Sequence, residues 1–156
     1  MMKLFTTTSS PIGTLSIAAE DGFITDIIFG SRVQDAAFGT CEILDTAVSQ
    51  LNEYFEKTRT KFDLPLKFGG TAFQNSVWRE LLSIPYGETI YYKTLAERVG
   101  NGKACRAVGM ANNKNPIPIV IPCHRVVGAN GSLTGYASGL DVKKFLLELE
   151  QKQELF

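Results

Sequence analysis

The sequence has very little histidine and cysteine, and it has no long apolar run. Of its 156 residues one is His and three are Cys, and the spacings of 64 and 18 residues between the Cys residues do not resemble a zinc framework. A zinc site that uses all three Cys and the His is the alternative. The longest apolar stretches are interrupted by proline, and the first residues lack the features of a signal peptide. We therefore expect a cytoplasmic protein with free thiols and no membrane partner.

The net charge is zero, but the charges are unevenly distributed. Residues 1–68 carry nine acidic and six basic side chains, whereas residues 69–156 carry seven acidic and ten basic ones. Six of these cations fall between Lys93 and Arg125, where Glu97 is the only acid. A local excess of this kind is typical of a surface that binds a polyanion, and an ordinary solvated face is the alternative.

The first half of the chain has the pattern of a sheet followed by a helix. Residues 3–29 are rich in strand formers with turn signals between them, and they predict a β-meander. An apolar period of 3.6 residues predicts a helix at about 41–57. Its expected buried face consists of Ile43, Ala47, Leu51, Tyr54 and Phe55. The composition changes at Gly69-Gly70, so we expect one domain over residues 1–68 and a second over residues 69–156.

The second half predicts four helices and one extended segment. Thr71 is a suitable N-cap for a helix over 72–84. Residues 93–99 and 103–113 predict two short helices around a glycine-containing turn, which is a helix-turn-helix pattern. Residues 117–127 are apolar and β-branched and predict a strand that the Asn130-Gly131 turn would fold into a hairpin with residues 132–134. The last helix is expected over 140–152, with Leu140, Phe145, Leu146 and Leu149 buried.

The helix over 103–113 has an unusual composition for a helix that reads DNA sequence. Its side chains are mostly small, and Arg106 is the only long cation in its middle. This composition suits close contact with the DNA backbone and the insertion of one side chain, as in minor-groove binders. Asn101 and the free N–H groups at the helix start are candidates to hold a phosphate. A packed helix face with a solvated Arg106 is the alternative.

The single His directly follows a Cys inside the apolar segment. A thiol and an imidazole are costly to bury unless their polar atoms have partners. A nearby base favours the reactive thiolate, so the pair indicates Cys123 as a nucleophile and His124 as its base. Adjacent residues of a regular strand point to opposite faces, and proton transfer therefore requires either a bend at Pro122 or a relaying water. A satisfied core pair is the alternative.

The segment Pro122-Cys123-His124-Arg125-Val126 resembles the active-site signature of the O6-alkylguanine-DNA alkyltransferases, which repair DNA by direct reversal. The similarity extends over residues 69–156, and the first half is similar, more distantly, to the family's N-terminal domain. The further matching segments are 71–74, 77–78, 84–89, 92, 107–109, 115–116 and 135–136. The resemblance implies an α+β fold, in which a ribonuclease-H-like sheet with a helix precedes a mostly helical, winged helix-turn-helix-like domain.

The resemblance also implies a reaction, that of a methylated-DNA–protein-cysteine S-methyltransferase. Cys123 accepts the alkyl group from O6 of guanine in a single irreversible turnover, and O4-alkylthymine is a candidate second substrate. His124 takes the thiol proton through a water, and Glu150 orients the imidazole. Asn115 braces the turn that holds the Cys, and Tyr92 protonates the leaving guanine. No metal and no organic cofactor is needed.

The matching positions further imply how the base and the DNA are held. The main-chain carbonyls of Cys123 and Val126 accept from the guanine amino group, the Ala137 N–H binds O6, and Tyr136 lines the pocket. Ala137 and Ser138 replace the Ser and Gly common in relatives, which limits the size of the alkyl group.

Arg106 fills the gap that the flipped base leaves in duplex DNA, on the minor-groove side, and Asn101, Lys103 and Ala107 join the DNA contact. We expect a monomer. The alternatives are a protein that binds alkylguanine without transferring the group, a helix-turn-helix transcription factor and a Cys hydrolase.

Overall fold

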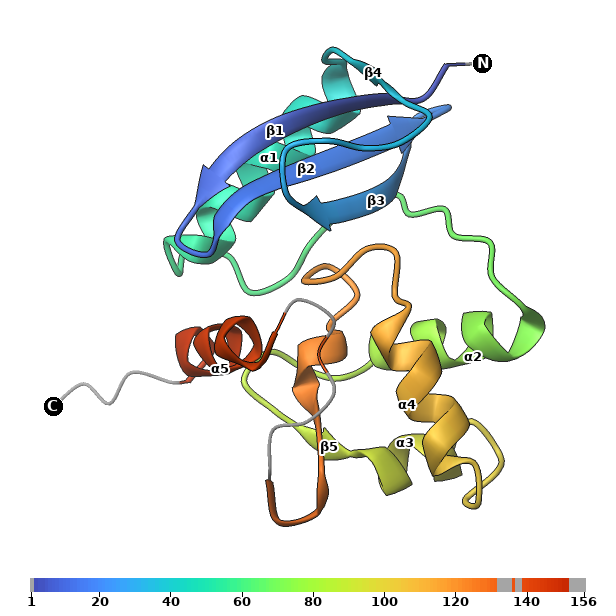
Figure 1. Cartoon of the computed structure of the whole chain (residues 1–156). Helices are drawn as coiled ribbons and strands as arrows, with labels where there is room; N and C mark the ends of the chain where they lie inside the picture. Colours follow the sequence, from blue (N-terminus) through green and yellow to red (C-terminus); the bar gives the residue numbers. More distant parts are fainter. Residues whose placement is uncertain (1, 132–135, 137–138, 152–156) are drawn as a thin grey trace, which may run out of the picture. The chain divides into compact units, whose positions relative to one another are not determined.

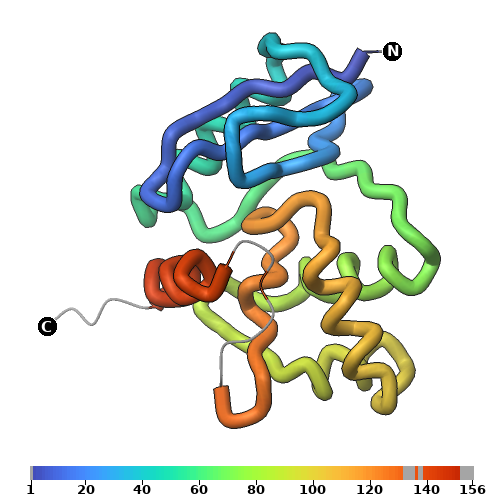
Figure 2. Tube along the Cα trace, in the orientation of Figure 1, coloured from blue at the N-terminus to red at the C-terminus, as the bar shows by residue number. Residues whose placement is uncertain are grey.

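The computed structural model describes residues 2–131, 136 and 139–151. The chain divides into two compact units, one of residues 1–68 with 116–118, the other of residues 69–115 with 119–156. Figures 1 and 2 follow the chain through both units. Strands predominate in the first unit and helices in the second, so the expected α+β class is confirmed. Within the described ranges, no helix is both long and apolar enough to cross a membrane.

The first unit is built on a four-stranded sheet (Figure 1). β1 (Leu4–Ser10), β2 (Gly13–Glu20) and β3 (Phe23–Phe29) form the expected antiparallel meander. The turn between β2 and β3 has positive φ at Asp21 and Gly22, 56° and 81°, the geometry that matches the twist of a hairpin. β4 (Ala37–Phe38) pairs in parallel with β1, so the order is β3-β2-β1-β4. β4 was not predicted, because two residues carry no periodic signal.

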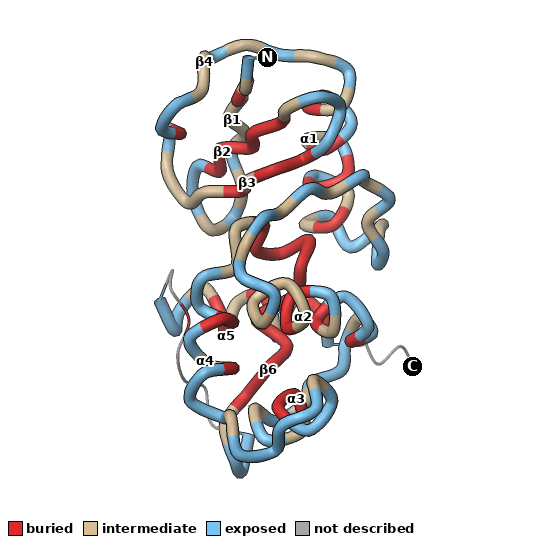
Figure 3. Tube along the Cα trace, turned by 90° about the vertical axis from the view of Figure 1, so that its right-hand side faces the viewer, coloured by how far each residue is buried: buried red, intermediate tan, exposed pale blue. Residues whose placement is uncertain are grey.

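Both faces of this sheet are covered. α1 (Glu42–Phe55) packs across β1, β2 and β3, and Phe5, Ala18 and Val33 form a small core cluster. Figure 3 shows the resulting buried run along β2 and β3. The helix is confirmed, but its buried face is turned by about one residue from the expected one. The buried residues are Leu44, Ala47, Gln50, Leu51 and Tyr54, whereas Ile43 and Phe55 are only half-buried.

The second unit is mostly helical. Its helices and strands are α2 (Ala72–Leu81), β5 (Ile90–Tyr91), α3 (Tyr92–Arg98), α4 (Cys105–Asn113), the 3₁₀ turns η1 (Cys123–Arg125) and η2 (Ala129–Gly131), β6 (Val126–Val127) and α5 (Leu140–Leu149). The N-cap at Thr71 is confirmed, since its hydroxyl accepts from the Gln74 N–H and the Gln74 side chain accepts from the Thr71 N–H, each at 3.0 Å. α2 ends three residues before the expected position. α5 also ends earlier, and Leu140 at its start is 48% exposed instead of buried.

α3 and α4 form the expected pair of short helices, and both pack against α2. Trp78 of α2 is buried, and its Nε1 donates to the carbonyl of Ala111 in α4 at 2.8 Å. α4 begins at Cys105 and not at residue 103. The reason is the turn before it, in which the Asn101 side chain accepts from the Lys103 N–H at 3.0 Å.

The strand expected over 117–127 is wrong except at its end. Only Val126–Val127 (β6) forms a strand, which pairs in parallel with β5 and not in a hairpin. Prolines interrupt the segment, and Ile119 has a φ of 76°, a left-handed conformation that is strained for a β-branched residue. The segment is nevertheless buried, so its residues are apolar because they belong to the core and not because they form a strand. Asn130 lies in η2 with a φ of 66°, and residues 132–134 of the expected hairpin lie outside the described residues.

Candidate active site

Cys123 lies at the start of a tight turn and not in a strand. Pro122 has φ −81° and ψ 66°, and the Cys123 N–H donates to the Ile121 carbonyl at 2.7 Å, which makes an inverse γ-turn. The Arg125 N–H then donates to the Pro122 carbonyl at 3.0 Å within η1. The bend expected at Pro122 is therefore confirmed. Cys123 and His124 are both buried in the second unit, in the run that leads to β6 (Figure 3).

Two asparagines hold this turn. Asn115, which follows α4, donates from Nδ2 to the Ile121 carbonyl at 2.7 Å, so it braces the chain that leads into the turn. Asn112, in the last turn of α4, donates from Nδ2 to the Cys123 carbonyl at 3.2 Å. Sequence reasoning missed Asn112. Its signal was its spacing of four residues from Val108, which places an amide on the buried face of the helix.

His124, Arg125 and Glu150 form a buried hydrogen-bonded cluster. His124 Nε2 lies 2.7 Å from Oε2 of Glu150, the residue that follows α5. Arg125 donates two hydrogen bonds to the same carboxylate, from Nε to Oε1 at 2.8 Å and from Nη2 to Oε2 at 3.0 Å. Its Nη1 donates to the Ile84 carbonyl at 2.6 Å. The structure thus brings His124 and Glu150 together, and it adds Arg125, which sequence reasoning named in the motif and among the cations but to which it gave no role in the site.

The hydrogen bond to Glu150 sets the tautomer of the neutral imidazole. Because a carboxylate only accepts, His124 Nε2 carries the proton and Nδ1 is left with the lone pair. Nδ1 makes no hydrogen bond to any residue of the described ranges. The ring therefore has one nitrogen fixed by Glu150 and one available as a proton acceptor.

Burial keeps the Cys123 thiol protonated. It raises the pKa of Cys123 to about 11, and the polar side chains of Asn115 and Tyr136 and the charge of Lys143 oppose this effect only in part. A thiol of this kind is a poor nucleophile at neutral pH, since the thiolate is the reactive form. Reaction at Cys123 therefore requires a base that takes the proton during the step.

His124 and Glu150 have protonation states that complement the neutral thiol. Burial lowers the pKa of His124, and this effect exceeds the opposing influence of Glu150, so the imidazole is neutral at neutral pH. Burial by itself would raise the pKa of Glu150, but hydrogen bonds from His124 and Arg125 outweigh it and lower that pKa to about 2. The site thus holds a neutral thiol, a neutral imidazole and a carboxylate paired with a guanidinium.

Lys143 is a second buried cation that sequence reasoning did not identify. It comes from α5, and its Nζ lies 3.5 Å from the Tyr92 hydroxyl and 5.6 Å from the centroid of the Tyr92 ring. Burial lowers the pKa of Lys143 to about 8, against the influence of Cys123, which raises it. Its signal in the sequence was a spacing of three residues from the buried Leu146. Lys143 thus lies beside Tyr92 and acts electrostatically on Cys123.

The residues expected to hold the base lie partly within the described ranges. Tyr136 is buried and interacts electrostatically with Cys123, and burial raises the pKa of its phenol above the ordinary value. The Val126 N–H donates to the Cys123 carbonyl, which also accepts from Asn112. A carbonyl has two lone pairs, so a guanine amino group would have to share this oxygen with those donors. The expected positions 137 and 138 lie outside the described residues.

The expected DNA contacts gather at the start of α4. Arg106 and Ala107 are exposed in its first turn, and Lys103 is exposed in the turn before it. Asn101 is exposed too, but its side chain accepts from the Lys103 N–H, so that N–H is not free for a phosphate.

The cations between residues 93 and 125 divide into two groups. Arg125 is buried in the active-site cluster and makes no part of a surface. The other five are exposed, namely Lys93, Arg98, Lys103, Arg106 and Lys114. Arg98 pairs with Glu80 at 3.8 Å, Lys103 and Arg106 lie at the start of α4, and Lys114 lies at its end.

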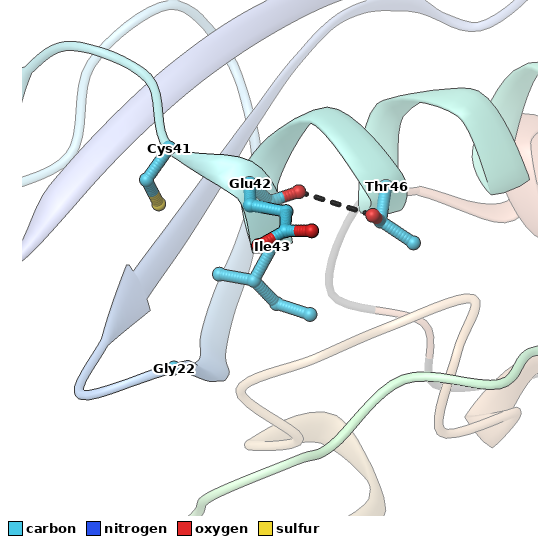
Figure 4. A pocket seen from close by; sticks show the side chains of 5 residues that line it. All are labelled: Gly22, Cys41, Glu42, Ile43 and Thr46. Atoms are coloured by element: carbon cyan, nitrogen blue, oxygen red, sulfur yellow. Dashed lines mark hydrogen bonds between the residues drawn. The ribbon is translucent and has the colours of Figure 1, made fainter.

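The other thiols show no comparable surroundings. Cys105 is exposed, and Cys41 precedes α1 at a hollow of about 480 Å³ (Figure 4). Gly22, Glu42, Ile43 and Thr46 also line this hollow, which offers a thiol and a carboxylate but no imidazole, because His124 is the only His. Among the described residues, no three His, Cys, Asp or Glu side chains gather where they could hold a metal ion. The zinc alternative therefore receives no support.

The two halves of the chain match two models of one protein family. Residues 3–68 match the ribonuclease-like domain of 6-O-methylguanine DNA methyltransferase, and residues 72–152 match its DNA binding domain. Together the two matches cover most of the chain.

Relatives and solved structures agree with this match. The chain is 50% identical over 146 residues to the methylated-DNA–protein-cysteine methyltransferase of Methanosarcina acetivorans, which covers 90% of this chain and 94% of the relative. It is 43% identical over 157 residues to that of Mycobacterium tuberculosis, with 96% and 93% covered. The crystal structure of Mycobacterium tuberculosis OGT in complex with DNA has a TM-score of 0.88 at 44% identity, with 95% of this chain and 92% of that chain covered. The resemblance inferred from the Pro122–Val126 motif is thus confirmed, and the chain belongs to the 6-O-methylguanine DNA methyltransferase family.

Proposed function

We propose that this protein repairs DNA by direct reversal, moving the alkyl group of O6-alkylguanine, methyl above all, from duplex DNA to Cys123. The supporting observation is the buried Cys123 thiol next to the His124–Glu150 hydrogen bond in a member of this family. The relatives named above are methylated-DNA–protein-cysteine methyltransferases, which is the same activity. O4-alkylthymine is a candidate second substrate.

The transfer itself is an in-line displacement. The Cys123 sulfur attacks the alkyl carbon, a C–S bond forms, and the bond between that carbon and guanine O6 breaks. The thiol proton passes through a water to His124 Nδ1, and Glu150 stabilises the imidazolium through Nε2. Tyr92 donates its proton to the guanine, which leaves as a neutral base and not as an anion. The product is a thioether, a poor leaving group, so each molecule acts once.

The resting protonation states support this division of roles. A thiol whose pKa is about 11 does not attack without a base, and the neutral imidazole beside it is a competent one. Lys143 is positioned to favour the thiolate as it forms, because its charge acts on Cys123. The same cation lies 3.5 Å from the Tyr92 hydroxyl, which favours proton donation by Tyr92 away from Lys143.

The division into two units supports an assignment of roles to the two expected domains. We assign alkyl acceptance and DNA binding to residues 69–156 and a structural role to residues 1–68. Arg106 inserts into the duplex from the minor-groove side when the lesion is flipped out, and Asn101, Lys103 and Ala107 contact the backbone around it. The exposed cations around α4 supply the charge that attracts the phosphates. The protein acts as a monomer in the cytoplasm.

The decisive test is the mass of the peptide that contains Cys123. Incubation with duplex DNA that carries O6-methylguanine should add one methyl group to this peptide and restore guanine in the DNA. Cys123→Ala should abolish the transfer but keep binding to the lesion, whereas the control Cys41→Ala should transfer normally. Folded protein with an unchanged peptide mass in excess lesion would exclude the proposal. Tight lesion binding under those conditions would identify a non-transferring alkylguanine-binding protein.

A second test separates base flipping from chemistry. Arg106→Ala should slow repair of duplex DNA far more than reaction with free O6-alkylguanine base, since the free base needs no flipping. Arg79→Ala removes an exposed arginine of α2 and serves as the matched control. Equal losses on the duplex and on the free base would rule out the insertion role of Arg106.

A further inference from the structure

Arg125 and His124 contact the same carboxylate, that of Glu150. Its side chain is almost wholly buried, and all three nitrogens of its guanidinium donate hydrogen bonds, two to Glu150 and one to the Ile84 carbonyl. Its Cζ also lies 5.7 Å from the centroid of the Tyr86 ring. Oε2 of Glu150 accepts from Arg125 Nη2, and the same oxygen lies 2.7 Å from His124 Nε2. One buried carboxylate is thus shared by a permanent cation and a titratable ring.

We propose that Arg125 is a positioning residue for alkyl transfer: it clamps and neutralises Glu150, so that His124 stays uncharged and able to accept the Cys123 proton. The proposal rests on the proposed function and adds to it a residue that acts on the base through Glu150.

A proton on His124 would create a charge in the buried interior of the unit. A buried carboxylate alone at 2.7 Å would strongly favour an imidazolium, and an imidazolium cannot accept a proton. With Arg125 paired to Glu150 the two charges cancel, and protonation of His124 would leave a net positive charge in the interior. Arginine stays charged at any pH of interest, so Arg125 disfavours protonation of His124 at every such pH.

The other charged groups around His124 act in known directions. Lys143 from α5 is a cation and disfavours the imidazolium, as Arg125 does, whereas Glu150 favours it. Among the remaining titratable groups, Cys123 and Tyr136 are neutral at neutral pH, and so is Tyr86, whose pKa is raised by burial and by Glu150. Burial and the two cations lower the pKa of His124 by more than the carboxylate raises it.

Arg125 also fixes the position of the Glu150 carboxylate. Glu150 follows the last residue of α5, an end from which a side chain can turn in several directions. The two parallel donors of Arg125 fix the plane of the carboxylate, and the third donor ties this arrangement to the residue before Pro85. A lysine at position 125 would keep the charge but lose the planar fork. Charge and geometry are therefore separable by substitution.

The first measurement is the titration of His124 by NMR. Because His124 is the only His in the chain, its ring signal needs no assignment. Arg125→Gln should raise the midpoint of this titration by about one pH unit or more, and Arg125→Lys should leave it near the wild-type value. The control Arg79→Gln, which removes an exposed arginine, should have no effect. Titration of folded Arg125→Gln at the wild-type midpoint would overturn the proposal.

A second pair of variants covers the case in which Arg125→Gln does not fold. Glu150→Gln leaves Arg125 as an unpaired cation, and the double variant R125Q/E150Q removes both charges at nearly constant shape. His124 should titrate at lower pH in Glu150→Gln than in the double variant, because only the single variant keeps the cation. Equal midpoints in these two proteins would show that Arg125 has no electrostatic effect on His124.

The functional readout is the single-turnover rate of methyl transfer between pH 5 and pH 9. Arg125→Gln should shift the acid limb of the profile upward with the NMR midpoint, so that its rate approaches the wild-type rate at high pH. A loss by the same factor at every pH would mean that Arg125 only supports the fold. If wild-type protein transfers no methyl group, the proposed function fails, while the NMR comparison still decides the effect of Arg125 on His124.

Discussion

Replacement of Glu150 by Gln should weaken the second unit in a strongly pH-dependent way. The carboxylate accepts from His124 and twice from Arg125, and all three side chains are buried. Glutamine keeps the shape but not the charge, and it leaves the guanidinium of Arg125 without its counterion. Loss of one partner of a buried ion pair typically costs about 3–5 kcal/mol at neutral pH.

The pKa of Glu150 gives the pH dependence. In the folded protein it is lowered from 4.5 to about 2. A lowered carboxyl pKa stabilises the folded state fully above pH 4.5, and this contribution is lost as the pH falls through about 2. The difference corresponds to about 3 kcal/mol in the free energy of unfolding, at about 1.4 kcal/mol for each tenfold change in proton affinity. About 2 kcal/mol of it is lost between pH 7 and pH 3.

Urea unfolding at pH 7 and at pH 3, followed by Trp fluorescence, measures this contribution. Trp78 is the only Trp and lies buried in the same unit as Glu150, so its emission reports the relevant transition. The stability gap between wild type and Glu150→Gln should be smaller by about 2 kcal/mol at pH 3 than at pH 7. Glu148→Gln removes an exposed glutamate of α5 and should show no such change. A gap of constant size at both pH values would refute the reasoning.

Three further predictions concern single contacts. Trp78→Phe removes the donor to the Ala111 carbonyl and should lower the free energy of unfolding by about 1–2 kcal/mol, measured by circular dichroism in urea; an unchanged midpoint would contradict it. Thr71→Ala removes the capping box of α2 and should cost about 1 kcal/mol in the same assay, whereas a neutral effect would mean that the cap is dispensable. Tyr92→Phe keeps the ring beside Lys143 but loses the hydroxyl, and it should slow methyl transfer by about 10²-fold or more with little change in stability; a wild-type rate would remove Tyr92 as the proton donor.

Local signals in the sequence predicted most of the elements and failed where tertiary contacts decide. The β-meander, α1, the cap at Thr71 and the pair α3 and α4 follow from periodicity and turn chemistry, and all are present. The apolar stretch over 117–127 misled, because burial gives the same composition to a strand and to an irregular core segment. β4 is too short to carry a pattern, and it exists because β1 offers an edge to pair with.

Some residues of the candidate site could be predicted from the sequence, and others could not. The Cys123-His124 pair could be identified from the sequence because an imidazole next to a thiol in an apolar run is rare, and the motif around it names the family. The roles of Arg125, Asn112 and Lys143 in the site could not be predicted. Each is a polar side chain that folding buries, and its partner is distant in the chain, as with the separation of 25 residues between Arg125 and Glu150.

The sequence by itself predicted the groups that we propose to react: one thiol, one imidazole and the tyrosine and basic helix that the resemblance to the family places around them. Only the tertiary structure decided the protonation states of these groups before the reaction. Burial holds the thiol of Cys123 protonated and His124 neutral, and Glu150 is charged because His124 and Arg125 both donate hydrogen bonds to it. A pKa depends on solvent exclusion and on charges a few ångströms away in space, and neither is a property of neighbouring residues in the chain.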